Sequence, residues 1–166
     1  MTVSLIQHLV IWSFVSLLAW AAISDTLHLI IPNRVSLGLV LLYPAQVLIA
    51  GPGIDTLLAI AVAAVVLLAA AGLFARGWLG GGDVKLMAAT ALWAGPKFAG
   101  DFLLVMTLSG AVLAVVLLTP MAALWPIYLS PEPAANGGAR RLRRNMPYGV
   151  AIAIGGFYVA MHLIAP

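Results

Sequence analysis

The chain has 166 residues, of which 64% are hydrophobic and only 8% are charged, with a formal net charge of +3. A water-soluble domain carries roughly 25% charged residues, so this composition excludes one. It predicts an all-α membrane protein with a single polytopic domain spanning residues 1–166, and with room for about six spans of ~20 residues. The chain has no cysteine, which excludes disulfides and a cysteine-ligated zinc site.

Six apolar segments are predicted to be membrane spans. In chain order they are Leu5 to Ile23, Val35 to Ala50, Ile54 to Phe74, Leu86 to about Ala94, Phe102 to about Leu124, and Pro147 to about Ile164. The first resembles a signal peptide, but no Lys or Arg precedes its apolar run, so we interpret it as a retained helix.

Polar segments are predicted to separate these spans. The first span should end at Ser24-Asp25, before a polar segment from Thr26 to Arg34, and the residues from Gly95 to Asp101 should form a loop. The fourth helix is short: even from Val84 to Ala99 it would cover roughly 24 Å. The hydrocarbon core is about 30 Å thick, so either this helix begins below the membrane surface or the bilayer thins around it.

The cations predict an orientation. With six spans, seven of the eight Lys and Arg residues fall on one side, including the four arginines at 140, 141, 143 and 144 in a flexible loop from Pro131 to Asn145. Only Lys97 falls on the other side. By the positive-inside rule the cation-rich side is cytoplasmic, so both termini face outward. The arginine cluster is interpreted as a topology anchor that contacts anionic lipid, and not as a nucleic-acid site.

The stretch from Arg76 to Lys85 interrupts the apolar chain with four glycines, a carboxylate and two cations. Asp83, at the entrance of an apolar helix, has two interpretations. A carboxylate at membrane depth is costly, which favours a functional role. Alternatively, Asp83 caps the helix by accepting hydrogen bonds from free backbone N–H groups.

Asp25 should lie on the same side as Asp83 and at a similar depth. Two carboxylates that meet in a partly desolvated site can share one proton. One can then activate a water as general base while the other donates a proton to a carbonyl oxygen. Such chemistry needs neither a metal nor a cofactor. His8, His28 and His162 are scattered over different helix ends, which argues against a metal site.

These residues resemble a known family. Gly80-Gly81-Gly82-Asp83 fits the G-x-G-D motif of intramembrane aspartyl proteases. Asp83-Val84-Lys85, Asp25 followed after five residues by Ile31-Pro32-Asn33, and the segment from Met146 to Ala151 look like the type IV prepilin peptidases. The resemblance implies that Asp25 and Asp83 are the catalytic pair. It also implies that the reaction removes the leader peptide of a prepilin or pseudopilin at the cytoplasmic face of the bacterial inner membrane.

One departure from the family narrows this expectation. Larger members carry a segment with four cysteines and also methylate the new pilin N-terminus, whereas this chain has no cysteine. It resembles the short form that accompanies tight-adherence (Flp) pili, which implies peptidase activity without methyl transfer. Archaeal preflagellin peptidases share the motifs and stay open as an alternative.

Supporting roles follow for further residues. Gly80 and Gly82 would permit the tight turn that orients Asp83. Lys85 would steer substrate carbonyls, pair with an aspartate or serve as an anchor cation, and Pro32 and Asn33 would shape the start of the second span, with Asn33 as cap. Pro147 would occupy the first turn of the last helix, and Tyr148 would line the site or lie at the membrane interface. Gly155-Gly156 in the last span would permit close helix packing.

The rival hypothesis is a non-enzymatic membrane component, such as a small transporter or a pilus-assembly subunit. Buried aspartates also serve in proton relays. Against this, the acidic residues do not form a chain across the bilayer. Asp25 and Asp83 are the only ones near cytoplasmic helix ends, whereas Asp55 and Asp101 lie on the outer side and Glu132 lies in the arginine-bearing loop.

Overall fold

The computed structural model describes residues 2–51, 55–118 and 146–164, and every long element among them is a helix. In chain order these are α1 (Thr2–His28), α2 (Asn33–Ala50), α3 (Thr56–Ala75), α4 (Gly81–Leu118) and α5 (Tyr148–Ile164). The all-α class is confirmed. The end of the predicted fifth span, the loop from Pro131 to Asn145 and its arginines lie outside the described residues.

By length and composition, three of the described helices can cross a membrane: Leu5–His28 of α1, α3 and α4. The apolar parts of α2 and α5 are shorter, at Asn33–Ile49 and Tyr148–Ile164. Large apolar side chains cover the outside of the bundle, with Leu48 84%, Leu57 78% and Leu68 73% exposed. Lipid, and not water, is the solvent that such a surface suits. The chain is therefore an apolar helical membrane protein.

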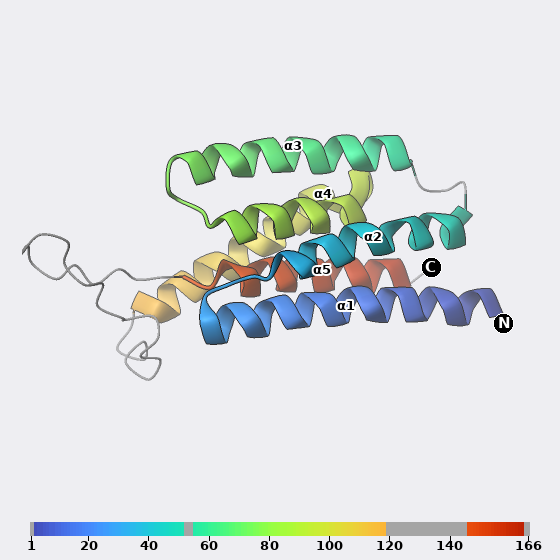
Figure 1. Ribbon diagram of the computed structural model, residues 1–166, viewed down its shortest axis with the longest axis horizontal. Helices are drawn as coiled ribbons and strands as arrows, with labels where there is room; N and C mark the ends of the chain where they lie inside the picture. Colours follow the sequence, from blue (N-terminus) through green and yellow to red (C-terminus); the bar gives the residue numbers. More distant parts are fainter. Residues whose placement is uncertain (1, 52–54, 119–145, 165–166) are drawn as a thin grey trace, which may run out of the picture.

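α4 is two helices joined at a sharp kink. Gly95 adopts φ 57° and ψ −169°, a backbone conformation that glycine reaches without a Cβ penalty, and Pro96 begins the second half. Figure 1 shows the two halves of α4 running in opposite directions along the bundle. The predicted break at Gly95 is thus present, but the predicted loop to Asp101 is wrong, because residues 96–101 are helical.

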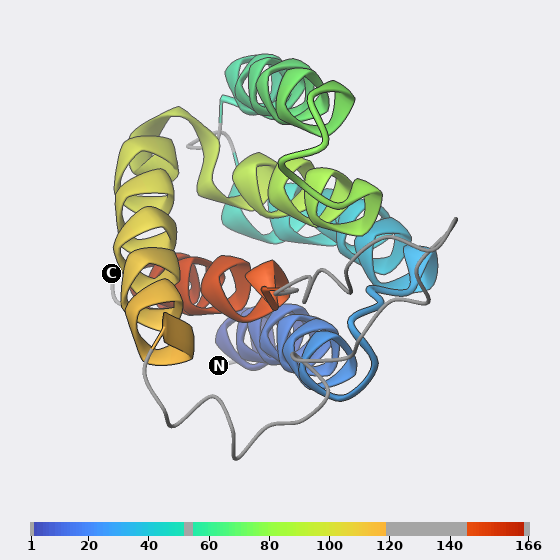
Figure 2. The same ribbon diagram turned by 90° about the vertical axis from the view of Figure 1, so that its left-hand side faces the viewer.

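The first half of α4 forms the centre of the molecule. It is about 21 Å long, shorter than the ~30 Å hydrocarbon core. Most of its side chains from Val84 to Ala94 are buried. In Figure 2 it lies between α3 and the other helices, while the second half of α4 lies along one flank beside α5. A short helix whose middle is buried among other helices does not have to span lipid by itself.

Trp93 joins three helices in the core. Its ring stacks on Phe14 of α1 with centroids 4.3 Å apart and meets the edge of Tyr43 at 5.9 Å. Its Nε1 donates a hydrogen bond of 2.9 Å to the Leu39 carbonyl of α2. A buried indole with its one donor satisfied fixes the register of α4 against α1 and α2.

Two adjacent glycines let α5 approach its neighbours closely. A Cβ at Gly155 would lie 2.9 Å from the Phe102 ring, and one at Gly156 would overlap Leu18. The close helix packing predicted for these glycines is present. It brings the start of α5 to the end of α1, where Asp25 lies.

Candidate functional site

The site forms where four helix ends meet. Figure 1 shows that α1 ends, and that α2, α4 and α5 begin, toward the same end of the bundle. The sequence predicts this meeting for the ends that carry Asp25 and Asp83. The backbone at each end holds its carboxylate in a different way.

Asp25 lies in the last turn of α1 and is only 5% exposed. Its Oδ2 accepts a hydrogen bond of 2.7 Å from the backbone N–H of Gly149, at the start of α5. An N–H that points at a carboxylate forms a strong, charge-assisted bond. Asp25 is thus anchored by a residue 124 positions away in the sequence.

The helix that carries Asp25 is longer than predicted. α1 continues through Asp25 to His28. The polar side chain of Thr26 is compatible with this helix, because its Oγ1 donates a hydrogen bond of 2.7 Å to the Ala22 carbonyl and so needs no water partner. It ends at Leu29, which has φ 54° and whose N–H bonds the Asp25 carbonyl at 2.9 Å. A bulky residue in the left-handed region is strained, and strain of this kind is held in place only by the surrounding structure.

Asp83 lies in the first turn of α4 and is partly buried. Its Oδ2 accepts a hydrogen bond of 3.1 Å from the N–H of Gly80, just before the helix. This is the backward reach of an acidic residue in a capping box, so Asp83 does satisfy a helix-end N–H group. The capping and the functional interpretations of Asp83 are therefore compatible: the same bond that caps the helix also fixes the carboxylate.

Ile31 separates the two helix ends that hold the aspartates. A Cβ at Gly82 would lie 3.0 Å from Ile31 Cβ, and one at Gly149 would lie 3.0 Å from Ile31 Cδ1. The segment between α1 and α2 is therefore wedged between α4 and α5, where glycines leave room for it. Ile31 therefore lies beside Gly82, the neighbour of Asp83, and beside Gly149, whose N–H binds Asp25.

Pro32 lies at the start of the second span as predicted, whereas Asn33 differs from its predicted role. Pro32 precedes the helix, with φ −64° and ψ 133°, and provides no side-chain cap. Asn33 is the first helical residue, so its predicted role as cap is wrong. Its Oδ1 instead accepts a hydrogen bond of 2.9 Å from Lys85 Nζ. This partner is an amide oxygen and not an aspartate, and the interpretations of Lys85 as a substrate-steering group or as an anchor cation stay predictions.

The last helix begins one residue later than predicted. Pro147 is fully buried immediately before α5, and not within its first turn. Tyr148 is half-buried and lines a pocket.

Gly80 leaves room for Asp83, because any side chain there would collide with it: a Cβ would lie 2.7 Å from Asp83 Oδ2. Gly149 and Ile31 were not predicted as site residues. Both lie in segments that resemble the family, Met146 to Ala151 and Ile31-Pro32-Asn33, and this resemblance was the signal that could have identified them.

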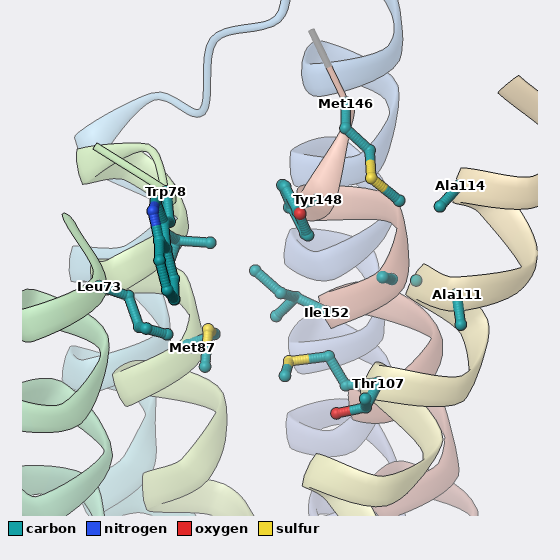
Figure 3. Close-up of a pocket in the computed structure, with 13 residues that line it drawn as sticks. Leu73, Trp78, Met87, Thr107, Ala111, Ala114, Met146, Tyr148 and Ile152 are labelled. Atoms are coloured by element: carbon teal, nitrogen blue, oxygen red, sulfur yellow. The ribbon is translucent and has the colours of Figure 1, made fainter. Parts of the chain in front are cut away.

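An apolar pocket of about 410 Å³ adjoins the site. Figure 3 shows Leu73, Trp78 and Met87 on one side of it, with Tyr148, Ile152 and the second half of α4 on the other. Leu79 and Tyr148 in its wall are the direct neighbours of Gly80 and Gly149, whose N–H groups bind the two aspartates. The full lining is Leu73, Trp78, Leu79, Met87, Met106, Thr107, Gly110, Ala111, Ala114, Met146, Tyr148, Ala151 and Ile152.

A second apolar pocket, of about 550 Å³, lies between α2, α3 and the first half of α4. Asn33 and Lys85 are in its wall. It borders the Asp83 side of the site but none of its lining residues belongs to α1 or α5. The pocket lined by Trp78 and Tyr148 is thus the one next to both carboxylate anchors.

Metal ligands do not gather in the described part of the chain, where no group of three or more His, Cys, Asp or Glu side chains comes together. His162, near the end of α5, packs on Tyr158 with centroids 4.2 Å apart. The described groups of the site include two carboxylates and the backbone N–H groups that bind them.

Comparison with known proteins identifies the family. Searches of curated proteins and of solved structures return no significant match. The model of the type IV leader peptidase family matches residues 12–119, more than half of the chain and including both Asp25 and Asp83. The chain therefore belongs to the type IV leader peptidase family.

Proposed function

We propose that this protein is an aspartic endopeptidase that removes the leader of a prepilin or pseudopilin, with Asp25 and Asp83 as its catalytic pair and without methyl transfer. Membership of a leader peptidase family supports a protease. The observation that supports the finer proposal is that both carboxylates are held at the same end of the bundle, Asp25 by the Gly149 N–H and Asp83 by the Gly80 N–H.

The pair performs hydrolysis by moving protons. The ionised carboxylate takes a proton from water as the hydroxyl oxygen bonds the scissile carbonyl carbon, while the protonated carboxyl group donates its proton to the carbonyl oxygen. When the tetrahedral intermediate collapses, the C–N bond breaks, the leaving amine takes a proton from the protonated carboxyl group, and the ionised carboxylate takes a proton from one hydroxyl group of the intermediate. The N–H groups of Gly149 and Gly80 hold the carboxylates in place, which lowers the entropy cost of the step.

The substrate's apolar helix is proposed to occupy the pocket lined by Trp78 and Tyr148. Three methionines in its wall, Met87, Met106 and Met146, adapt to varied apolar side chains. Gly110 and Ala114 lie one helical turn apart, and small residues at this spacing let another helix approach closely. A chain that leaves the pocket past Leu79 and Tyr148 passes the direct neighbours of Gly80 and Gly149, whose N–H groups bind the two aspartates.

Filling this pocket should weaken substrate binding. Ala111→Trp places an indole in the pocket, so we expect KM to rise about tenfold or more, with a smaller change in kcat. The matched control is Val112→Trp on the same helix, because Val112 is 64% exposed and does not line the pocket. Ala64→Trp places an indole in the second pocket. If Ala64→Trp raised KM and Ala111→Trp left KM unchanged, the substrate helix would be assigned to the second pocket instead.

We further propose that the site faces the cytoplasm from a bacterial inner membrane, with six spans if the halves of α4 count separately, and with both termini outside. Arg34, Arg76 and Lys85 lie at the end of the bundle that holds the site. Lys97 follows the kink at the opposite end, where it lies over the Phe98 ring. This distribution supports the cytoplasmic side for the aspartates.

Single cysteines test this orientation cleanly, because the chain has none of its own. Ala75→Cys, beside the site, should react with a membrane-impermeant maleimide only after the cytoplasmic side is opened. Gly100→Cys, at the kink end and in open space, should react in intact cells. Labelling of both from one side would reject the six-span arrangement.

The direct test of activity is cleavage of a co-expressed prepilin, read as a shift in size on a gel. A prepilin whose leader persists in the presence of the membrane-inserted protein would contradict the proposed reaction.

A further inference from the structure

One hydrogen bond joins the two motif segments that carry the site. Lys85 Nζ in the first turn of α4 donates 2.9 Å to Asn33 Oδ1 in the first turn of α2. The two residues are 52 positions apart in the sequence. Lys85 follows Asp83 by two residues, and Asn33 follows Ile31 by two. The bond therefore fastens the Asp83 helix to the segment that holds Ile31.

A second hydrogen bond fastens the other end of that segment. Ser24 Oγ, beside Asp25, donates 2.7 Å to the carbonyl of Ile30. The segment from Leu29 to Pro32 is thus tied to the Asp25 helix by Ser24 and to the Asp83 helix by Lys85 and Asn33. Leu29, with φ 54°, gives it a strained start that needs such ties.

Ile31, between the two ties, packs against the starts of both α4 and α5. It touches Gly82, next to Asp83, and it touches Gly149, whose N–H binds Asp25. A shift of this short segment would change the positions of α4 and α5 relative to each other. Because neither glycine has a side chain to take up the change, the shift would pass directly to the two aspartates.

We propose that Lys85 and Asn33 are positioning residues: their hydrogen bond holds the Ile31 segment against α4 and so sets the spacing of Asp25 and Asp83. This inference rests on the proposed function and assigns to Lys85 a positioning role that is separate from substrate contact. The ammonium group has only donors, which identifies the Asn33 carbonyl oxygen as its partner. The pair acts through the aspartates and does not touch the reacting atoms.

Steady-state kinetics of the purified protein in detergent, with a purified prepilin as substrate, tests the pair. Lys85→Met and Asn33→Leu should each lower kcat about 10- to 100-fold with little change in KM, since small misplacements of catalytic groups cost rate and not binding. The double variant should be no slower than the slower single variant, because both remove the same bond. Asn33→Asp keeps an acceptor and should recover most of the lost kcat.

The charge itself needs a matched control. Lys97→Met removes a cation at the opposite end of the bundle and should cleave as the parent does. A rise in KM in Lys85→Met, with Asn33→Leu at the parental rate, would overturn the proposal in favour of direct substrate contact. Parental kcat in both single variants would overturn it as well.

A readout without substrate separates this inference from the proposed function. The parent, the two single variants and the double variant can be unfolded by heat in detergent, with the intrinsic tryptophan fluorescence as signal. Coupling between the two substitutions in the unfolding midpoint supports the bond, and strict additivity rejects it. If the parent cleaves no prepilin, the proposed function fails, and this thermal cycle still decides whether Lys85 and Asn33 hold the segment.

Discussion

Asp25→Asn and Asp83→Asn should each abolish leader cleavage while the protein accumulates normally in the membrane. Each substitution is nearly isosteric and removes the ability to exchange a proton, which is worth about 10²- to 10⁴-fold in rate. In Asp25→Asn the new amide oxygen could still accept the Gly149 N–H, so the local fold should persist. The double variant should be no worse than either single, since residues that act as a unit are non-additive.

Two other aspartates provide controls for this experiment. Asp55 caps α3 by accepting a hydrogen bond of 3.0 Å from the Leu58 N–H, and asparagine caps equally well. Asp101 is exposed near the kink, away from the site. Asp55→Asn and Asp101→Asn should therefore cleave as the parent does. The gel shift of a co-expressed prepilin is compared with the membrane level of each variant. Parental cleavage by either Asp25→Asn or Asp83→Asn would reject the two-aspartate mechanism and leave that residue as a helix-end group.

The class of fold was predictable because it depends on composition. Long apolar runs with few charges favour helices in lipid; α1, α2, α3 and α5 each coincide with one of the predicted runs, and α4 coincides with two. The helix ends were less predictable. Ser24, Asp25 and Thr26 suggested the end of α1, but their side chains bond to the backbone or to α5, so polarity did not stop the helix. At Gly95 a single residue with φ 57° makes the turn for which a loop as far as Asp101 was expected.

The site was predictable in its chemistry but not in its geometry. Asp25 and Asp83 stand in motifs, and their position at helix ends follows from the order of the spans. The contact of Asp25 with Gly149 joins residues 124 positions apart, and one sequence contains no signal for such a pairing. One sequence likewise contains no signal for the contact of Ile31 with Gly82, or for the hydrogen bond from Lys85 in α4 to Asn33 in α2. These contacts depend on how the helices pack, which apolar periodicity cannot specify when every face is apolar.

Gly149→Ala should stop cleavage although it changes no catalytic group. A Cβ at this position would lie 2.8 Å from Asp25 Oδ2 and 3.0 Å from both Asp25 Cβ and Ile31 Cδ1. Contacts that short cannot persist, so Asp25, Ile31 or the start of α5 must move. A displacement on the order of 1 Å costs about 10²-fold in rate when it affects catalytic geometry. The strain should also lower the free energy of unfolding by about 1–3 kcal/mol.

Glycines in open surroundings isolate this effect from the general cost of replacing glycine. Gly72 in α3 and Gly100 in α4 are both helical, and a Cβ at either would meet nothing within 4 Å. Gly72→Ala and Gly100→Ala should cleave at the parental rate and be slightly more stable, because alanine is the better helix former. Gly82→Ala, where the added Cβ would lie 3.0 Å from Ile31 Cβ, should resemble Gly149→Ala. Cleavage is measured on the co-expressed prepilin, and stability by thermal unfolding of each purified variant. If Gly149→Ala cleaves as fast as Gly100→Ala, then the close approach of α5 to Asp25 is not part of the active arrangement, and the carboxylate must act from another position.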